Sequence, residues 1–250
     1  MPSQSRPVAL VTGSATGIGR ACAVRFAKLG YDVVVNYSQS DEDAEETVAL
    51  VEDAGANSLL IRCDVSADAE VVEMIAEVER TFGRLDVLVN NAGTTHFVDH
   101  KDLEAMSEEK WDRILAVNLK GPFFCIRAAA DLLRAGEGGA VVSVSSVAGI
   151  SGLGSSIAYC ASKGALNTMT KSLARVLAPK VRVNAVCPGP VDSRWLRGVM
   201  SKEELYDRTK EYPLPRPAQP DDITDAVIYL ATGTSLTTGQ LLVVDGGRTM

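Results

Sequence analysis

The sequence predicts a doubly wound α/β fold, in which a seven-stranded parallel sheet carries helices on both faces. Short apolar runs rich in valine alternate with longer segments of helical period, as in a parallel sheet covered by helices. Each run is bounded by turn residues. The chain has 250 residues, of which 46% are hydrophobic and 23% charged. This is the composition and length of a globular protein, and we expect one domain over residues 1–250.

The predicted strands are short and rich in β-branched residues. In chain order they cover residues 8–12, 32–36, 58–62, 86–90, 140–145, 181–187 and 241–245. The first predicted helix, residues 17–29, has an apolar stripe formed by Ile18, Ala21, Cys22, Phe26 and Leu29. A similar stripe further along is formed by Leu166, Met169, Leu173 and Leu177. A last helix is predicted over residues 221–231, because an acidic pair follows Pro220 and suits a helix N-terminus.

Residues 188–220 differ from the rest of the chain, since they contain six prolines. These prolines prevent a continuous helix, although residues 201–210 are expected to form a short one. Ligands of open α/β sheets bind at the carboxyl edge of the strands. We therefore expect residues 188–220 to form a substrate lid beside that edge.

Charge and cysteine usage exclude several classes of partner. The net charge of −7 argues against nucleic acid and anionic membranes, which require a basic face. No run of 18 apolar residues and no signal-like N-terminus occurs, so we expect a cytoplasmic protein with no membrane partner. The five cysteines have no zinc-ligand spacing, and His96, Asp99 and His100 fit exposed loop residues better than a metal site. No metal is expected.

A glycine-rich turn joins the first predicted strand to the first helix. Such a turn lets backbone N–H groups approach an anionic pyrophosphate, although a tight turn without a ligand is the alternative. The run from Thr12 to Gly19 resembles the T-G-x-x-x-G-I-G turn of short-chain dehydrogenases/reductases. The resemblance implies a Rossmann-type domain that binds a dinucleotide through Gly13, Ser14, Thr16, Gly17, Ile18 and Gly19.

Further motifs of this family follow in order along the chain. Asp64 and Val65 resemble the pair that contacts the adenine. Residues 90–93 resemble the family's N-N-A-G motif, whose matching cofactor residues are Asn91, Ala92 and Gly93. A later segment resembles the one that positions the nicotinamide carboxamide, and its matching residues are Pro188, Gly189, Val191 and Ser193.

A tyrosine and a lysine four residues apart lie on one face of a predicted helix. With Ser146 and Asn118, Tyr159 and Lys163 resemble the family's Asn-Ser-Tyr-Lys tetrad. A carbonyl that receives hydride develops negative charge on oxygen, so a positioned acid must protonate it. Tyr159 is the expected acid, with a pKa lowered by the nearby Lys163 cation.

The resemblance also implies roles for the other members of the tetrad. Lys163 would bond the ribose hydroxyls, Ser146 the substrate oxygen, and Asn118 a proton-relaying water. Ser145 is expected only to cap the strand end, and packing inside a helix is the alternative for Asn118.

The choice of cofactor depends on the end of the second strand. Asn36, Tyr37 and Ser38 stand where NAD-type members carry a carboxylate that binds the ribose diol. This favours NADP(H). Thr16, where many NADP-type members carry a basic residue, and the acids at positions 41–43 argue the other way, so NAD(H) stays open as the alternative.

Together these motifs predict an NAD(P)-dependent oxidoreductase that acts on a carbonyl or secondary alcohol, most like the 3-oxoacyl-acyl-carrier-protein reductases. A sugar, polyol or small-ketone dehydrogenase is one alternative, and a non-catalytic dinucleotide-sensing module is another. An epimerase or dehydratase of the extended branch would need a longer chain.

Several expectations concern what the enzyme binds. A carrier-protein thioester would need a basic docking surface, for which the candidates are Arg134, Lys180 and Arg182. Apolar side chains suggest a partly apolar substrate pocket, and they are Leu153, Trp195, Leu196, Val199 and Met200. The resemblance further implies a homotetramer that associates through residues 111–133 and 157–177.

Overall fold

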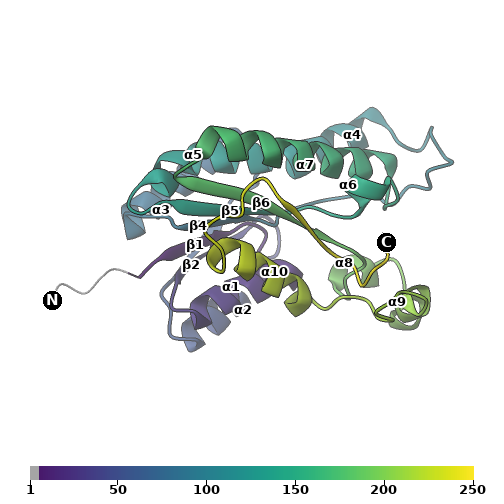
Figure 1. Cartoon of the computed structure of the whole chain (residues 1–250), viewed down its shortest axis with the longest axis horizontal. Coiled ribbons are helices and arrows are strands. Elements are labelled where there is room, and N and C mark those ends of the chain that lie inside the picture. Colours follow the sequence, from purple (N-terminus) through teal and green to yellow (C-terminus); the bar gives the residue numbers. More distant parts are fainter. Residues whose placement is uncertain (1–5) are drawn as a thin grey trace.

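The protein was analysed as a computed structural model, which describes residues 6–250. Seven strands form one parallel sheet in the order β3-β2-β1-β4-β5-β6-β7. Helices cover both faces of this sheet (Figure 1). The predicted fold class is therefore confirmed.

The strands agree with the sequence prediction to within one or two residues. They are β1 (Val8–Val11), β2 (Asp32–Tyr37), β3 (Ser58–Arg62), β4 (Val87–Asn90), β5 (Gly139–Val144), β6 (Val181–Pro188) and β7 (Leu241–Val244). β4 begins one residue later than predicted. The Asp86 carboxylate there accepts a hydrogen bond from the Val8 N–H at 2.7 Å, so this residue anchors the neighbouring strand.

The helices between the strands are mostly long and amphipathic. They are α1 (Gly17–Lys28), α2 (Asp41–Asp53), α3 (Asp68–Phe82), α4 (Glu108–Leu115), α5 (Gly121–Arg134), α6 (Ala148–Ser151), α7 (Ile157–Leu177), α8 (Arg194–Arg197), α9 (Lys202–Thr209) and α10 (Pro220–Thr232). One π-helical turn, η1 (Ala116–Lys120), joins α4 to α5. No described helix is long and apolar enough to cross a membrane.

Two of the helix starts differ from the prediction for reasons of capping. Ser201 is the N-cap of α9, where its hydroxyl and the Glu204 carboxylate form a capping box, so the helix itself begins at Lys202. Pro220 is the first residue of α10 rather than the residue before it. Proline is tolerated there because its missing N–H would have no partner inside the helix.

Each face of the sheet has its own apolar core. One core packs α1, α2 and α10 against side chains such as Val11 and Val35. The other packs α3, α5 and α7 against the opposite face, including Leu10 and Leu88. Figure 1 shows these two helical layers above and below the sheet. The stripe predicted on α1 ends at Phe26, because Leu29 is 51% exposed.

Candidate active site

The glycine-rich turn after β1 is held tightly from two sides. The Asn36 amide oxygen accepts a hydrogen bond from the Gly13 N–H at 3.1 Å, and the Asn91 amide donates to the Gly13 carbonyl at 2.8 Å. Gly13 and Gly17 have positive φ angles of 61° and 57°, which favour glycine. A Cβ on Gly19 would lie only 2.4 Å from the Gly13 carbonyl oxygen. The backbone can therefore approach a ligand closely here, as a dinucleotide pyrophosphate requires.

A cleft of about 1460 Å³ runs along the carboxyl ends of the strands. It brings together most of the residues predicted to bind the cofactor, which are Gly13, Thr16, Gly17, Ile18, Asn36, Ser38, Asp64, Val65, Asn91, Ala92, Gly93, Tyr159, Lys163, Pro188, Gly189, Val191 and Ser193. Ser14, Gly19 and Tyr37 do not line it. The Ser14 hydroxyl instead accepts from the Asn36 N–H at 3.0 Å, so it helps to hold the turn.

Ser146 and Tyr159 meet on this cleft, one after β5 and the other on α7. Burial raises the pKa of Tyr159 to about 12, while a hydrogen bond with the Ser146 side chain opposes the rise. From its spacing, Lys163 is expected to lower the pKa of Tyr159. This expectation is wrong for the protein without a ligand. The pKa is raised instead, because burial of the phenol outweighs the opposing hydrogen bond.

Lys163 is almost completely enclosed, with 4% of its surface exposed. Its ammonium donates to the Val144 carbonyl at 2.8 Å and lies 5.7 Å from the centre of the Tyr159 ring. Burial lowers the pKa of Lys163 to about 8. An ammonium has three N–H donors, so Lys163 can also donate to a ligand in the cleft that it lines.

Ser145 and Asn118 are both buried and bonded to protein partners, although Ser145 also lines the cleft. The Ser145 hydroxyl donates to the Asn167 side chain at 2.6 Å. Asn118 lies in η1, accepts from the Thr94 N–H at 2.8 Å, and donates to the Thr94 carbonyl at 2.9 Å and the Ser162 hydroxyl at 3.1 Å. Asn118 is not among the cleft-lining residues. Its contacts position the chain after β4.

At the other end of the cleft, two predicted cofactor residues already have protein partners. The Asn36 amide donates to the Cys63 carbonyl at 3.1 Å, in addition to its contact with Gly13. Although burial of Asp64 opposes ionisation, hydrogen bonds from Ser66 and Arg113 lower the pKa of its carboxyl. Asn36 therefore shapes this end of the cleft, while Asp64 presents a charged carboxylate there.

The family model described as Enoyl-(Acyl carrier protein) reductase matches residues 13–249 of this chain. A solved structure from Burkholderia xenovorans, titled as a short-chain dehydrogenase/reductase, has a TM-score of 0.91 and 40% identity, and covers 98% of both chains. The chain belongs to the short-chain dehydrogenase/reductase family. This confirms the resemblance inferred from the motifs.

Two relatives show what this short-chain dehydrogenase/reductase is similar to. A protein of Streptomyces violaceoruber, named as a ketoacyl reductase of the granaticin polyketide synthase, is 43% identical over 242 residues, or 96% of this chain and 95% of that protein. A 3-oxoacyl-(acyl-carrier-protein) reductase of Staphylococcus aureus is 41% identical over 244 residues, or 97% and 98% of the two chains. The chain is an oxidoreductase of this family, and the alternative of a non-catalytic sensing module is set aside.

The motif search missed the segment that follows the N-N-A-G turn. Residues 94 and 96–100 line the cleft, and they include both histidines. The signal that could have found them is their position at the carboxyl end of β4, where ligands of such sheets bind. His96 and His100 are partly buried here rather than exposed as expected.

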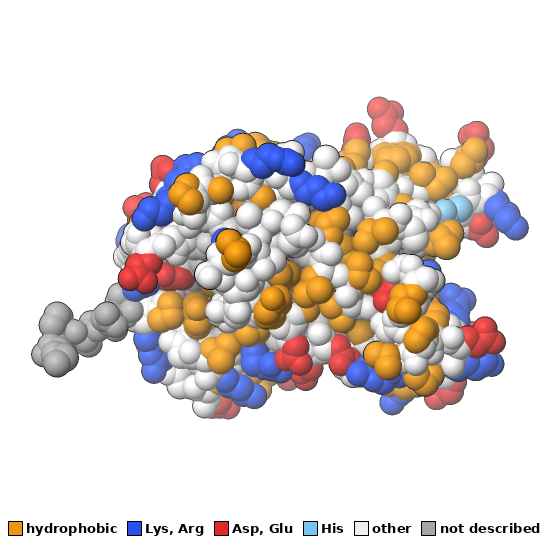
Figure 2. All heavy atoms as spheres, viewed as in Figure 1, with side chains coloured by type: hydrophobic (Ala, Val, Ile, Leu, Met, Phe, Trp, Pro, Cys, Tyr) orange, Lys and Arg blue, Asp and Glu red, His pale blue; other side chains and the backbone are white. Residues whose placement is uncertain are grey.

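Apolar side chains from residues 188–220 lie at the end of the cleft that holds Tyr159. Trp195, Leu196 and Met200 line it, whereas Val199 does not. The Trp195 ring centre lies 6.2 Å from that of Tyr159. Figure 2 shows hydrophobic side chains gathered on this side of the molecule, between the regions of α6 and α9. Leu153, also predicted for the substrate pocket, lines the cleft as well.

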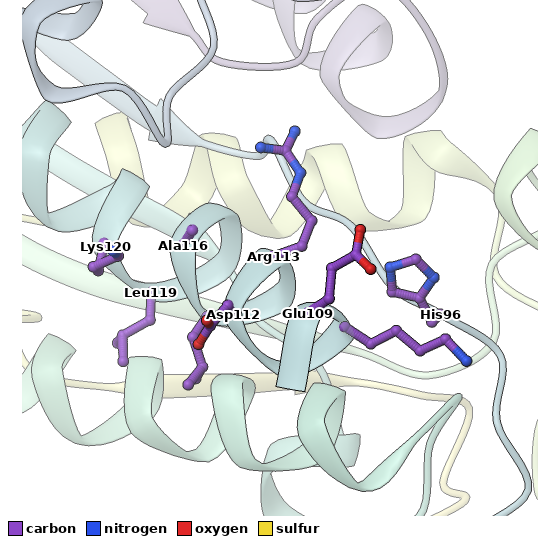
Figure 3. Close-up of a pocket in the computed structure, with 9 residues that line it drawn as sticks. His96, Glu109, Asp112, Arg113, Ala116, Leu119 and Lys120 are labelled. Atoms are coloured by element: carbon purple, nitrogen blue, oxygen red, sulfur yellow. The ribbon is translucent and has the colours of Figure 1, made fainter. Parts of the chain in front are cut away.

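A second pocket of about 890 Å³ runs along α4 and η1. Figure 3 shows His96 at one end of it and Leu119 and Lys120 at the other. His96 and Arg113 line both this pocket and the large cleft. Arg113, which also bonds Asp64 at 3.0 Å, therefore lies between the two cavities.

The candidate carrier-docking residues are in the wrong place. Lys180 and Arg182 lie at the amino end of β6, whereas the cleft lies at its carboxyl end, at Pro188. Arg182 and Pro188 are six positions apart along the strand, or about 20 Å. Arg134 ends α5 and pairs with Asp131, and it too does not line the cleft. The predicted strand over residues 181–187, with ligands at its carboxyl end, already places Lys180 and Arg182 at the opposite end of the strand.

Proposed function

We propose that this enzyme transfers hydride between NADP(H) and a carbonyl or secondary alcohol, with Tyr159 as general acid and base. The proposed activity is most like that of a 3-oxoacyl-(acyl-carrier-protein) reductase. A thioester of the acyl-carrier protein is therefore a candidate substrate. The observation that carries the proposal is the meeting of Ser146, Tyr159 and Lys163 on one cleft that begins at the glycine-rich turn. There the partly buried Tyr159 phenol is hydrogen-bonded to the Ser146 hydroxyl.

The residues present fit a nicotinamide dinucleotide. The close-packed glycine turn would hold its pyrophosphate, and Lys163 would bond the ribose next to the nicotinamide. The bound cofactor supplies the hydride. Ser146 donates a hydrogen bond to the substrate oxygen and so orients it beside Tyr159. With a pKa of about 12, the phenol is protonated at neutral pH and can donate its proton to the oxygen in the reductive direction.

Replacement of the proposed acid tests this mechanism. We expect Tyr159→Phe to lower kcat for NADPH-dependent reduction of an acetoacetyl thioester by about 10²- to 10⁴-fold, the usual contribution of a positioned acid. Tyr229→Phe is the matched control, because Tyr229 is half-exposed on α10 and does not line the cleft. The NADPH dissociation constants of both variants separate the loss of the acid from any loss of cofactor binding.

The outcome also separates the substrate classes. Full activity of Tyr159→Phe would contradict the proposed mechanism. Turnover of sugars, polyols or small ketones, without turnover of the thioester, would keep the mechanism and replace the substrate.

The preference for NADP over NAD is supported by one cation near the end of β2. The Arg62 guanidinium donates to the Ser38 carbonyl at 3.3 Å and is exposed. The acid that follows in the chain, Asp41, is engaged by the Tyr37 hydroxyl, a hydrogen bond that raises the pKa of Tyr37. Arg62 can therefore receive the 2′-phosphate, which a guanidinium binds well.

We expect Arg62→Gln to lower the ratio of kcat/KM for NADPH over NADH by about 10-fold, the loss of one charge-assisted contact. Arg175→Gln is the control, because Arg175 is exposed on α7 and bonds only its own helix. An unchanged ratio would show that Arg62 does not select the cofactor.

We also propose a homotetramer, as the family resemblance implies. Exposed apolar side chains on α5 and α7 support it, since Phe123, Ile157 and Val176 are 39%, 37% and 68% exposed. Light scattering during size-exclusion chromatography measures the mass directly, and the mass of a single chain would overturn this proposal.

A further inference from the structure

Two arginines of the described chain differ from all the others. Most arginines in residues 6–250 pair with a carboxylate, and Arg62, Arg175 and Arg182 donate to backbone carbonyls. Within residues 6–250, the guanidinium groups of Arg208 and Arg248 form neither kind of contact. Yet both line the large cleft.

Most carboxylates near these arginines in the chain are occupied elsewhere, and Glu211, three residues after Arg208, is exposed and does not line the cleft. Glu204, one helical turn before Arg208, accepts from the Ser201 N–H at 2.7 Å. Asp207 pairs with Lys210 at 2.6 Å. Asp245 accepts from the Gly247 and Thr249 N–H groups, each at 2.9 Å. Both guanidinium groups therefore remain available to a ligand.

The cleft offers them little negative charge of its own. Of the described residues that line it, the carboxylates are Asp64 and Asp99. Asp64 is paired with Arg113 at 3.0 Å, and Asp99 accepts from the Lys101 N–H at 2.9 Å on the loop after β4. An excess of positive charge thus remains on the wall formed by α9 and the C-terminal turn.

The two arginines come from segments that are bonded to each other. The Leu214 N–H, shortly after α9, donates to the Gly246 carbonyl at 2.9 Å. Gly247 has a φ of 86°, and a Cβ there would lie 2.7 Å from the Pro213 ring. Figure 1 shows the C-terminus beside α8 and α9. The C-terminal turn therefore holds Arg248 against the segment that follows Arg208.

Their position in the sheet separates them from the adenine end of the cleft. Arg248 follows β7, at one edge of the sheet. Asn36 lies near the end of β2, and Ser38 follows that strand. β2 and β7 are five places apart in the sheet, or about 24 Å at the usual strand spacing. The proposed reacting end of the cleft lies between these two positions, because Ser146 follows β5 and Pro188 is the last residue of β6. Arg248 therefore lies beyond the reacting end and away from the site of the 2′-phosphate.

We propose that Arg208 and Arg248 bind an anionic group, a phosphate or a carboxylate, on the end of the substrate that is remote from its carbonyl. The inference rests on the proposed function and narrows its substrate class. Apolar residues of the same cleft, among them Trp195, Met200 and Leu205, suit the chain between the carbonyl and the anion. Guanidinium groups bind both kinds of anion with charge-assisted hydrogen bonds.

Two pairs of ketones, each differing by one anionic group, test the proposal. One pair is S-acetoacetyl-pantetheine with and without its 4′-phosphate, and the other is 7-oxooctanoate and its methyl ester. We expect the anionic member of one pair to have a kcat/KM about 10- to 100-fold higher, mainly through KM. The pair that shows the preference identifies the anion. The preference should weaken as salt is added.

In the double variant Arg208→Gln/Arg248→Gln, the ratio of kcat/KM for the anionic ketone over its neutral partner should fall close to one. The control Arg175→Gln should leave this ratio unchanged. Equal kcat/KM values within both pairs, or a preference that survives in the double variant, would overturn the inference and leave the proposed function standing. Failure to turn over any of the four compounds would instead count against the proposed function. Calorimetry then measures binding of the same compounds without reduced cofactor. Tighter binding of the anionic member than of the neutral one, in the wild type but not in the double variant, supports the inference. Equal binding of the two members by the wild type overturns it.

Discussion

Ser145 and Ser146 are neighbours in the chain, but their hydroxyl groups face different environments. The Ser145 hydroxyl is buried and donates to Asn167 at 2.6 Å, whereas Ser146 hydrogen-bonds Tyr159. We expect Ser145→Ala to lower the free energy of unfolding by about 1–3 kcal/mol, because the buried Asn167 oxygen then keeps only the weak thiol donor of Cys187 at 3.7 Å. Ser146→Ala should mainly lower kcat, by about 10²-fold.

Urea unfolding and steady-state kinetics on both variants measure this division. Each serine variant is the control for the other, since both remove one hydroxyl from adjacent positions. A large kcat loss in Ser145→Ala with full stability would reverse the assignment.

Among the elements, α8 is short and is held by a contact outside itself. It has only four residues, and Arg194 at its start donates to both carboxylate oxygens of Asp43 on α2, each at 2.7 Å. Ser193, just before α8, lies against Gly17 of the glycine-rich turn. The Arg194–Asp43 pair therefore links the two sides of the cleft across this turn.

We expect Asp43→Asn and Arg194→Gln each to raise the dissociation rate of NADPH by about two- to five-fold, since a partly exposed pair is modest in strength. Stopped-flow displacement of the fluorescent cofactor measures this rate. Glu42→Gln removes a charge from the same turn of α2 and should leave the rate unchanged. Equal rates in all three variants and the wild type would show that the pair does not hold the cofactor.

Over the whole molecule, the five cysteines determine how stability responds to alkaline pH. Burial raises the pKa of Cys22 and Cys63 from 9.0 to about 12, and it also raises those of Cys125, Cys160 and Cys187. Above about pH 9 the unfolded chain therefore loses protons that the folded protein keeps, so the free energy of unfolding falls as pH rises. Lys163, with a pKa lowered to about 8, instead raises the free energy of unfolding as pH rises. It is a single group, whereas five cysteines act the other way.

Urea unfolding under reducing conditions between about pH 8 and pH 10.5 should show this fall. Cys22→Ala should make its slope shallower, by up to about 1.4 kcal/mol per pH unit. A free energy of unfolding that is constant or rises over this range would contradict the prediction.

The fold and most of the cleft could be predicted because their signals are local. Strand β3 begins and ends where the sequence predicts, since turn residues bound an apolar run. The glycine turn and Tyr159 with Lys163 were found from their spacing. The docking residues Lys180 and Arg182 were misplaced, because they were chosen for their charge alone and not for their position at the amino end of the predicted strand.

By itself, the sequence determined the alternation of strands and helices, the turn that can receive a pyrophosphate, and the residue types of the proposed reacting group. Periodicity, turn chemistry and motif spacing are properties of neighbouring residues, so they can be read without coordinates. Only the tertiary structure decided which side chains share an environment. It buried Tyr159 and so raised its pKa, turned the Ser145 hydroxyl toward Asn167, and placed Arg208 and Arg248 on one cleft from segments 40 residues apart. Burial and pairing depend on contacts between distant parts of the chain, which only packing establishes.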